Sequence, residues 1–149
     1  LLRPATALDL ESLQHLWLDV DLPAWRVEAR GGGLWLIALT DNSVQDIGCV
    51  ALRPSAMAAP LHASRGAPME PLVILRLAHR GQGYAQEALK AVLWHAQSAS
   101  TGRCFVATCD VPNRAADRLL RRVGFVPGYE ADGGRWRVRQ YRLPSMAAP

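Results

Sequence analysis

The sequence has few of the residues that build metal centres or disulfide scaffolds. Its 149 residues include three cysteines and four histidines. Cys49, Cys104 and Cys109 lie within apolar runs and lack the paired spacing of a zinc knuckle or a secreted disulfide framework, and the histidines are scattered along the chain. We therefore predict that the cysteines are buried free thiols and that the protein binds no metal.

Long hydrophobic runs are also missing. No stretch approaches the roughly 18 consecutive apolar residues of a membrane-spanning helix, and no basic segment leads into an apolar one as in a signal peptide. We expect a cytoplasmic protein without a membrane partner. The length and the 50% hydrophobic content suit a chain with one core, so we expect a single domain over residues 1–149.

Lysine is nearly absent from the basic residues. Seventeen basic residues against thirteen acidic ones give a net charge of +4, and Lys90 is the single lysine. The arginines are spread along the chain, without the interleaved aromatic side chains on which single-stranded nucleic acids stack. This distribution fits a small phosphorylated ligand better, and we expect no nucleic-acid partner.

Hydrophobic periodicity predicts strands that alternate with helices. Thr6 and Asp9 resemble a capping box before a first helix, and the segment 84–96 carries the apolar stripe of an amphipathic helix. A further helix is expected at 113–123, with Gly124 as its left-handed C-cap. Strands are expected at 34–39, 47–52, 72–77, 104–109 and 135–143, and a long loop at 53–68. This order indicates an α/β or α+β sheet with helices on its faces.

The most informative segment is the turn that joins the strand at 72–77 to the helix at 84–96. The first N–H groups of a helix lack internal partners and lie at its positive dipole end, so a turn that directs them to one point binds phosphate. Gly81 and Gly83 would let the backbone approach a phosphate, and Arg80 would add a charge-assisted contact. Such turns also use glycine for purely structural reasons, so phosphate binding and simple chain reversal stay equally open at this point.

Two common nucleotide-binding loops do not match this turn. The Walker loop ends in Gly-Lys-Ser/Thr, which is missing, and the dinucleotide fingerprint needs a glycine or alanine where Gln86 stands. However, Arg80-Gly81-Gln82-Gly83-Tyr84-Ala85 resembles the Arg/Gln-x-x-Gly-x-Gly/Ala signature of the GNAT superfamily of acyl-CoA N-acyltransferases. Downstream, Asn113-Arg-Ala-Ala-Asp-Arg-Leu-Leu-Arg-Arg-Val-Gly124-Phe125 resembles a later motif of that superfamily, at the expected separation. The branch to which the chain is most similar includes enzymes that acetylate ribosomal-protein N-termini.

The resemblance implies a fold and a cosubstrate. The fold would be a mixed, mostly antiparallel sheet of about seven strands with helices on both faces, splayed open where the strands at 72–77 and 104–109 diverge. Acetyl-CoA would lie in that gap, where the backbone groups of Leu75 and Leu77 would pair with the amides of its pantetheine arm. Its pyrophosphate would lie on the turn, with Asn113 either contacting the carrier or only capping its own helix. The cofactor-binding residues implied are Leu75, Arg76, Leu77, Arg80, Gly81, Gln82, Gly83, Tyr84, Ala85 and Asn113.

Catalysis in the superfamily is direct attack of a neutral amine on the thioester, so the resemblance also implies a proton acceptor. Glu70 stands ten residues before Arg80, where related enzymes often place a glutamate base, and it is the candidate here. The alternative is a solvated acid at a loop edge, because Pro68 and Pro71 flank it. Many relatives carry a tyrosine general acid on the second helix, and by spacing that position is Leu120 here.

Two functions follow from the resemblance. The first is an N-acetyltransferase that moves acetyl from acetyl-CoA to a primary amine, on a protein N-terminus or a small molecule. The second is a non-catalytic acyl-CoA binding or sensing module, which the missing tyrosine favours. The acceptor, the acyl-chain preference and the oligomeric state, a homodimer included, stay open.

Overall fold

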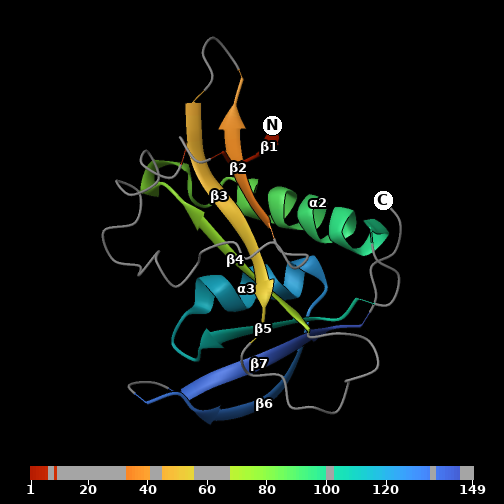
Figure 1. The fold of residues 1–149 in the computed structure, drawn as a ribbon. Coiled ribbons are helices and arrows are strands. Elements are labelled where there is room, and N and C mark those ends of the chain that lie inside the picture. Colours follow the sequence, from red (N-terminus) through yellow and green to blue (C-terminus); the bar gives the residue numbers. More distant parts are fainter. Residues whose placement is uncertain are drawn as a thin grey trace.

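The computed structural model describes residues 1–6, 9, 33–40, 45–55, 68–99, 103–134 and 137–144. In this part the chain forms one seven-stranded sheet, two α-helices and a short 3-10 helix (Figure 1). The elements in chain order are β1 (Leu2–Pro4), β2 (Gly33–Leu39), β3 (Gln45–Pro54), β4 (Met69–Leu75), η3 (Leu77–His79), α2 (Tyr84–Ala99), β5 (Phe105–Asp110), α3 (Arg114–Val123), β6 (Val126–Asp132) and β7 (Arg137–Leu143).

The sheet is mostly antiparallel, with one parallel junction at its centre. The strand order is β1-β2-β3-β4-β5-β7-β6, and β4 with β5 is the parallel pair. Seven residue pairs join β3 to β4, but among the described residues Met69 with Phe105 is the one registered pair between β4 and β5. The two central strands therefore meet at their beginnings and then diverge. This confirms the predicted splayed sheet.

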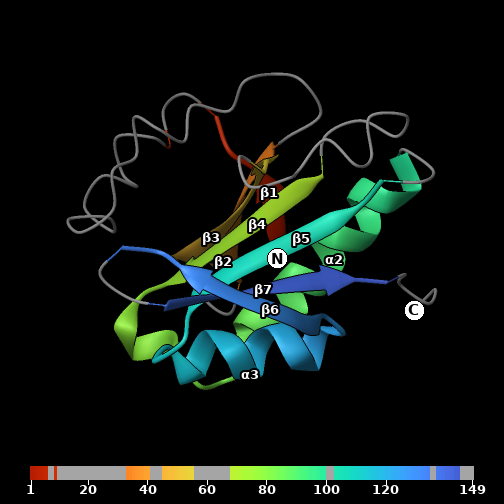
Figure 2. The same ribbon diagram turned by 90° about the horizontal axis from the view of Figure 1, so that it is seen from below.

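Helices α2 and α3 pack against the same face of the sheet (Figure 2). The apolar stripe predicted for α2 is buried in the main core, where it meets Phe105 and Leu75 of the central strands. Helix α3 contributes Leu120 and Val123 to the same core, and Gly124 ends it at φ +108°, as predicted. The stripe of α2 consists of Ala88, Leu89, Val92, Leu93 and Ala96.

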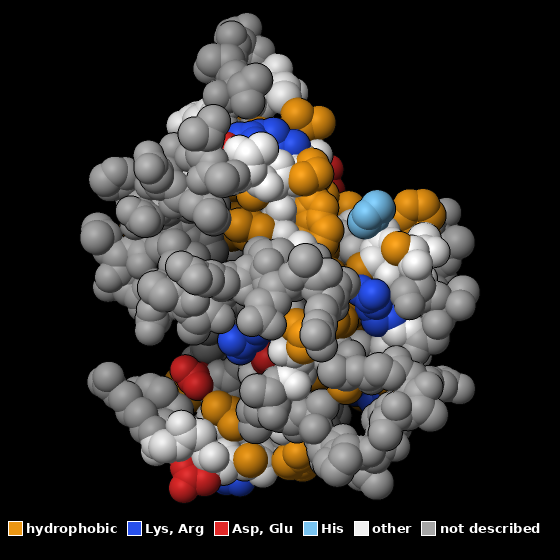
Figure 3. Space-filling view, viewed as in Figure 1, with side chains coloured by type: hydrophobic (Ala, Val, Ile, Leu, Met, Phe, Trp, Pro, Cys, Tyr) orange, Lys and Arg blue, Asp and Glu red, His pale blue; other side chains and the backbone are white. Residues whose placement is uncertain are grey.

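The opposite face of the sheet carries a second, smaller apolar cluster. Leu36 and Cys49 are its buried residues, and Leu72 and Ile74 of β4 pack against them. Figure 3 views this face and shows hydrophobic side chains gathered over β2 and β3. Successive side chains of a strand point to opposite faces, so Glu70 lies on the same side of β4 as Leu72 and Ile74. The helix predicted after Thr6 lies outside the described residues beyond Asp9, so the described residues do not test the prediction of helices on both faces of the sheet.

Several predicted boundaries were wrong. The strand predicted at 72–77 begins at Met69 and ends at Leu75, and residues 77–79 form the 3-10 helix η3 instead. The segment 126–132, for which no strand position was given, pairs with β7 as β6. Strand β3 continues to Pro54, into the segment predicted as a loop. These strand ends are set by pairing with neighbours that lie far away in the sequence.

The described residues also bear on the predictions made for the cysteines, for membrane spans and for metal sites. All three cysteines are free thiols; Cys49 is buried, and burial raises the pKa of its thiol to about 12, whereas Cys104 and Cys109 are half-buried. Within the described ranges, no helix is long and apolar enough to cross a membrane. The same ranges hold no group of three or more His, Cys, Asp or Glu side chains arranged to bind a metal.

Candidate active site

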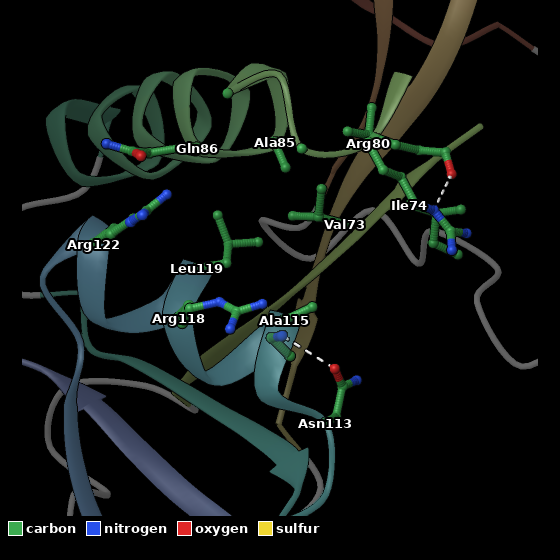
Figure 4. A pocket seen from close by; sticks show the side chains of 14 residues that line it. Val73, Ile74, Arg80, Ala85, Gln86, Asn113, Ala115, Arg118, Leu119 and Arg122 are labelled. Carbon is green, nitrogen blue, oxygen red and sulfur yellow. Dashed lines mark hydrogen bonds between the residues drawn. The ribbon is translucent and has the colours of Figure 1, made fainter. Parts of the chain in front are cut away.

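A pocket of about 450 Å³ opens between the end of β4, the start of α2 and one side of α3 (Figure 4). It lies on the helix-bearing side of the splay, where β4 no longer pairs with β5. Its volume is within the usual range for small-molecule sites. The lining residues are Val73, Ile74, Leu75, Arg80, Gly81, Gly83, Ala85, Gln86, Asn113, Ala115, Ala116, Arg118, Leu119 and Arg122.

The turn before α2 presents free backbone amides at this pocket. Within the described part of the chain, no hydrogen-bond acceptor is found for the backbone N–H groups of residues 81–85. Gly81 and Gly83 have φ of +77° and +92°, which side-chain-bearing residues rarely adopt, and a Cβ added to either would meet open space. The space next to these amides is therefore kept free of side chains, as an anion site requires.

Two side chains of the turn hold it in place through hydrogen bonds to backbone carbonyls. Arg80 Nε donates a hydrogen bond of 3.0 Å to the carbonyl oxygen of Leu75, and Gln82 Nε2 donates one of 3.0 Å to that of Ala78. Both contacts tie the turn to the residues that precede it. The guanidinium of Arg80 is thereby held at the rim of the pocket (Figure 4).

The structure brings six of the ten predicted cofactor-binding residues into this pocket: Leu75, Arg80, Gly81, Gly83, Ala85 and Asn113. Asn113 also caps α3, because its side-chain oxygen accepts a hydrogen bond of 3.1 Å from Ala116 N. Its two predicted roles are thus compatible.

The other four, Arg76, Leu77, Gln82 and Tyr84, do not line the pocket. Arg76 Nε donates to the carbonyl oxygen of Asp46, at 2.9 Å, on the β3 side. The carbonyl oxygen of Leu77 accepts from Arg80 N at 3.2 Å within the turn of η3. Leu77 follows the end of β4, so it does not continue the strand edge along which the pantetheine was expected to pair.

Helix α3 supplies pocket residues that the sequence analysis missed. Arg118 and Arg122 lie one helical turn apart on its pocket side, with Ala115 and Leu119 between them and the sheet (Figure 4). The helical period counted from Asn113 was the signal that could have found them, since residues three and four apart share a face. Among the described residues, the lining of the pocket includes three arginines and no acidic residue.

Glu70 lies at the point where the splay begins, directly after Met69 in β4. Glu70 is 6% exposed, so the alternative of a solvated acid at a loop edge was wrong. Thr108 of β5 donates a hydrogen bond of 2.7 Å to Oε1, and Arg53, its register partner in β3, donates to Oε2 at 3.2 Å. Each carboxylate oxygen therefore has a hydrogen-bond partner on a neighbouring strand.

The position where relatives carry a tyrosine is occupied by a core residue. Leu120 is 7% exposed and packs in the main cluster. None of the three tyrosines, all of them in the described ranges, lines the pocket. Tyr141 is buried and donates its hydroxyl hydrogen to Asp117, while Tyr129 is exposed on β6.

Comparison with known proteins places this geometry in context. Residues 1–126 match the family described as the acetyltransferase (GNAT) domain. No curated protein matches the sequence.

Solved structures of similar fold cover nearly the whole chain. A variant of spermidine N-acetyltransferase SpeG from Vibrio cholerae is 17% identical, with a TM-score of 0.72, over 96% of this chain and 94% of that one. A ribosomal-protein-alanine N-acetyltransferase from Brucella melitensis is 21% identical, with a TM-score of 0.71, over 95% and 97%. The protein yncA from Salmonella typhimurium, solved with its cofactor acetyl-CoA, is 22% identical, with a TM-score of 0.70, over 100% and 96%. At these identities the likeness shows the fold.

Proposed function

The chain belongs to the GNAT acetyltransferase family, and from this premise we propose that it transfers the acetyl group of acetyl-CoA to a primary amine by direct attack of the amine on the thioester. One observation carries the proposal: free backbone amides and three arginines line a pocket at the open end of the splay, and a buried carboxylate, Glu70, lies where the splay begins. The amides and arginines suit a phosphorylated carrier, and the carboxylate suits removal of a proton from the amine.

The residues of the pocket fit coenzyme A. A diphosphate needs several converging donors and room to approach them, and the turn at 80–85 offers unpartnered N–H groups next to two glycines that leave the space open. Arg80 adds a positive charge at the same place. Val73, Ala85 and Leu119 give the same pocket apolar walls, against which the uncharged arm of the carrier would pack.

Acetyl-CoA, when bound, supplies an acetyl thioester. As the carbon–nitrogen bond forms and the carbon–sulfur bond breaks, the amine must lose a proton and the leaving thiolate gains one. Glu70 accepts the amine proton, directly or through water, because it is the buried carboxylate at the point where β4 and β5 begin to diverge. Water protonates the thiolate, since Leu120 has no acidic group to offer. Positioning of the two reactants then contributes the larger part of the rate enhancement.

The class of acceptor is supported by the names of two structural relatives. One is a spermidine N-acetyltransferase and the other a ribosomal-protein-alanine N-acetyltransferase, so both names specify acetylation on nitrogen. We therefore propose a primary amine as acceptor, on a small molecule or a peptide N-terminus.

The test is release of free thiol from acetyl-CoA by the purified chain, with a panel of polyamines and short peptides. Glu70→Gln keeps the shape of the side chain but removes the proton acceptor, so we expect kcat to fall by roughly 10²- to 10⁴-fold while the affinity for acetyl-CoA is unchanged. Asp132→Asn is the matched control, because Asp132 is exposed and an amide oxygen can still accept from Gly134 N. Full activity of Glu70→Gln would remove Glu70 from the mechanism.

The burial of Leu120 favours a second candidate, a non-catalytic acyl-CoA binding module. A carrier-binding module would need the cradle but no general acid. The same assay separates the two functions. In one outcome the wild-type protein binds acetyl-CoA yet releases no more thiol than Glu70→Gln with every amine in the panel. That result would support the non-catalytic binding module and contradict the acetyltransferase.

A further inference from the structure

Two arginines of α3 line the pocket without an acidic partner in the described part of the chain. Arg118 and Arg122 make no ion pair there, although Arg121 of the same helix and Arg139 of β7 do. Arg121 pairs with Asp117 at 3.0 Å, and Arg139 pairs with Asp117 and Glu130. Unpaired guanidinium groups beside a pocket are available to an anionic ligand.

The charge of the pocket exceeds what a diphosphate requires. Arg80, Arg118 and Arg122 give the described lining residues a formal charge of +3, because none of these residues is acidic. The free amides of the turn and Arg80 already line the pocket at the start of α2, where the helix dipole adds about half a positive charge and where the diphosphate is proposed to bind. Arg118 and Arg122 lie across the pocket on α3, so their charges remain for another anionic group (Figure 4).

That group should be compact and doubly charged. The two arginines are four residues apart on one helix, so their side chains lie on the same face and line the same pocket. In Figure 4, Arg122 extends from α3 toward Gln86 on α2, and Arg118 lies one turn earlier along α3. A phosphomonoester carries close to two negative charges at neutral pH and accepts several hydrogen bonds at once, which suits two planar guanidinium groups.

We propose that Arg118 and Arg122 bind the 3′-phosphate of the coenzyme A ribose and make the protein discriminate against 3′-dephospho-coenzyme A. The proposal rests on the proposed function, because it assumes that the carrier is coenzyme A. The turn at 80–85 then binds the diphosphate, which coenzyme A and 3′-dephospho-coenzyme A share. The arginine pair binds the 3′-phosphate, which only coenzyme A carries.

The experiment is calorimetric titration of the full chain with coenzyme A and with 3′-dephospho-coenzyme A. We expect the wild-type protein to bind coenzyme A roughly ten- to a hundredfold more tightly, and this ratio to fall to about one in the double variant Arg118→Gln/Arg122→Gln. The affinity for the dephospho carrier should change little in the double variant. Raising the salt concentration should reduce the wild-type ratio, since both arginines are exposed.

Arg121→Gln is the control, because it removes one positive charge from the same helix at a position outside the pocket lining. It should keep the wild-type ratio. Equal binding of the two carriers by the wild-type protein, or an unchanged ratio in the double variant, would overturn the inference while leaving the proposed function intact. Absence of binding by either carrier to the wild-type protein would overturn both.

Discussion

The hydroxyl of Thr108 donates a hydrogen bond of 2.7 Å to the carboxylate of Glu70, and this bond crosses the opening between β4 and β5. The two strands share the registered pair of Met69 with Phe105 just before this point. The contact therefore joins the two edges of the splay through side chains, where backbone pairing has ended. It also fixes the direction of the carboxylate that we propose as proton acceptor.

Replacement of Thr108 by valine tests this positioning role. Valine keeps the branched shape but has no donor, so the carboxylate of Glu70 would lose one of its two partners. We expect kcat for acetyl transfer to fall by roughly tenfold or more, since small misplacement of a reacting group is costly. Affinity for acetyl-CoA should be unaffected, because Thr108 does not line the pocket.

Thr108→Ser provides the control for that substitution. Serine retains the hydroxyl donor and loses a methyl group, so it should restore most of the rate that valine removes. If serine and valine variants lost activity equally, the effect would come from packing, and a positioning role for the hydroxyl would be wrong.

Gly83 is expected to be required for carrier binding through its backbone conformation. At φ +92° an alanine would be strained by about 1–3 kcal/mol, and relief of the strain would turn the adjacent amides. Its Cβ would also enter the open space in front of them. We predict that Gly83→Ala weakens coenzyme A binding by at least tenfold, as measured by calorimetry.

Gly134 provides the control for the Gly83→Ala substitution. Gly134 has φ +89°, has the same open surroundings and does not line the pocket. Gly134→Ala should therefore cost a similar amount of thermal stability but leave coenzyme A affinity at the wild-type level. A folded Gly83→Ala protein with unchanged affinity would show that the turn does not hold the carrier.

The two roles of Asn113 can be separated by charge. Asn113→Asp preserves an oxygen that can accept from Ala116 N, so the cap of α3 and the melting temperature should be retained. The new negative charge would lie beside a pocket built for anions, and we expect coenzyme A affinity to fall severalfold. Asn113→Ala should instead lose about 1 kcal/mol of stability. Wild-type affinity in the aspartate variant would leave capping as the role of Asn113.

Local patterns predicted the helices and the turn because their determinants are neighbours in the sequence. The buried stripe of α2, the αL conformation of Gly124 and the open glycines 81 and 83 all follow from spacings of a few residues. The arginine pair of α3 follows from the same kind of spacing. It was missed because no partner for it could be seen before α2 and α3 were placed on one face of the sheet.

Long-range pairing decided what local patterns could not. Pro68 and Pro71 made the segment around Glu70 resemble a loop, yet Pro71 pairs in register with Leu52 of β3. That pairing puts Arg53 opposite Glu70, and the ion pair between them offsets the free-energy cost of burying the carboxylate. The sequence could not show that a charge 17 residues away would neutralise it.

Asp117 joins the pocket-bearing helix α3 to strand β7, and its contribution to stability should depend on pH. It accepts hydrogen bonds from Tyr141, Arg121 and Arg139. The hydrogen bond from Tyr141 is the main cause that lowers the pKa of Asp117 below its ordinary 3.8. Burial raises the pKa of Tyr141, so its hydroxyl remains a donor at neutral pH.

A lowered pKa in the folded state means that ionised Asp117 stabilises the fold above the pKa of the unfolded chain, and that this contribution is lost as pH falls below it. Asp117→Asn should therefore lower the melting temperature at pH 7, and the gap to wild type should narrow as pH falls from about 4 toward the folded-state pKa. Melting curves from pH 7 to pH 3 measure this, with Asp132→Asn as a control whose gap should stay small throughout. A gap for Asp117→Asn that is constant over this range would mean that geometry, and not the charge of Asp117, holds α3 against β7.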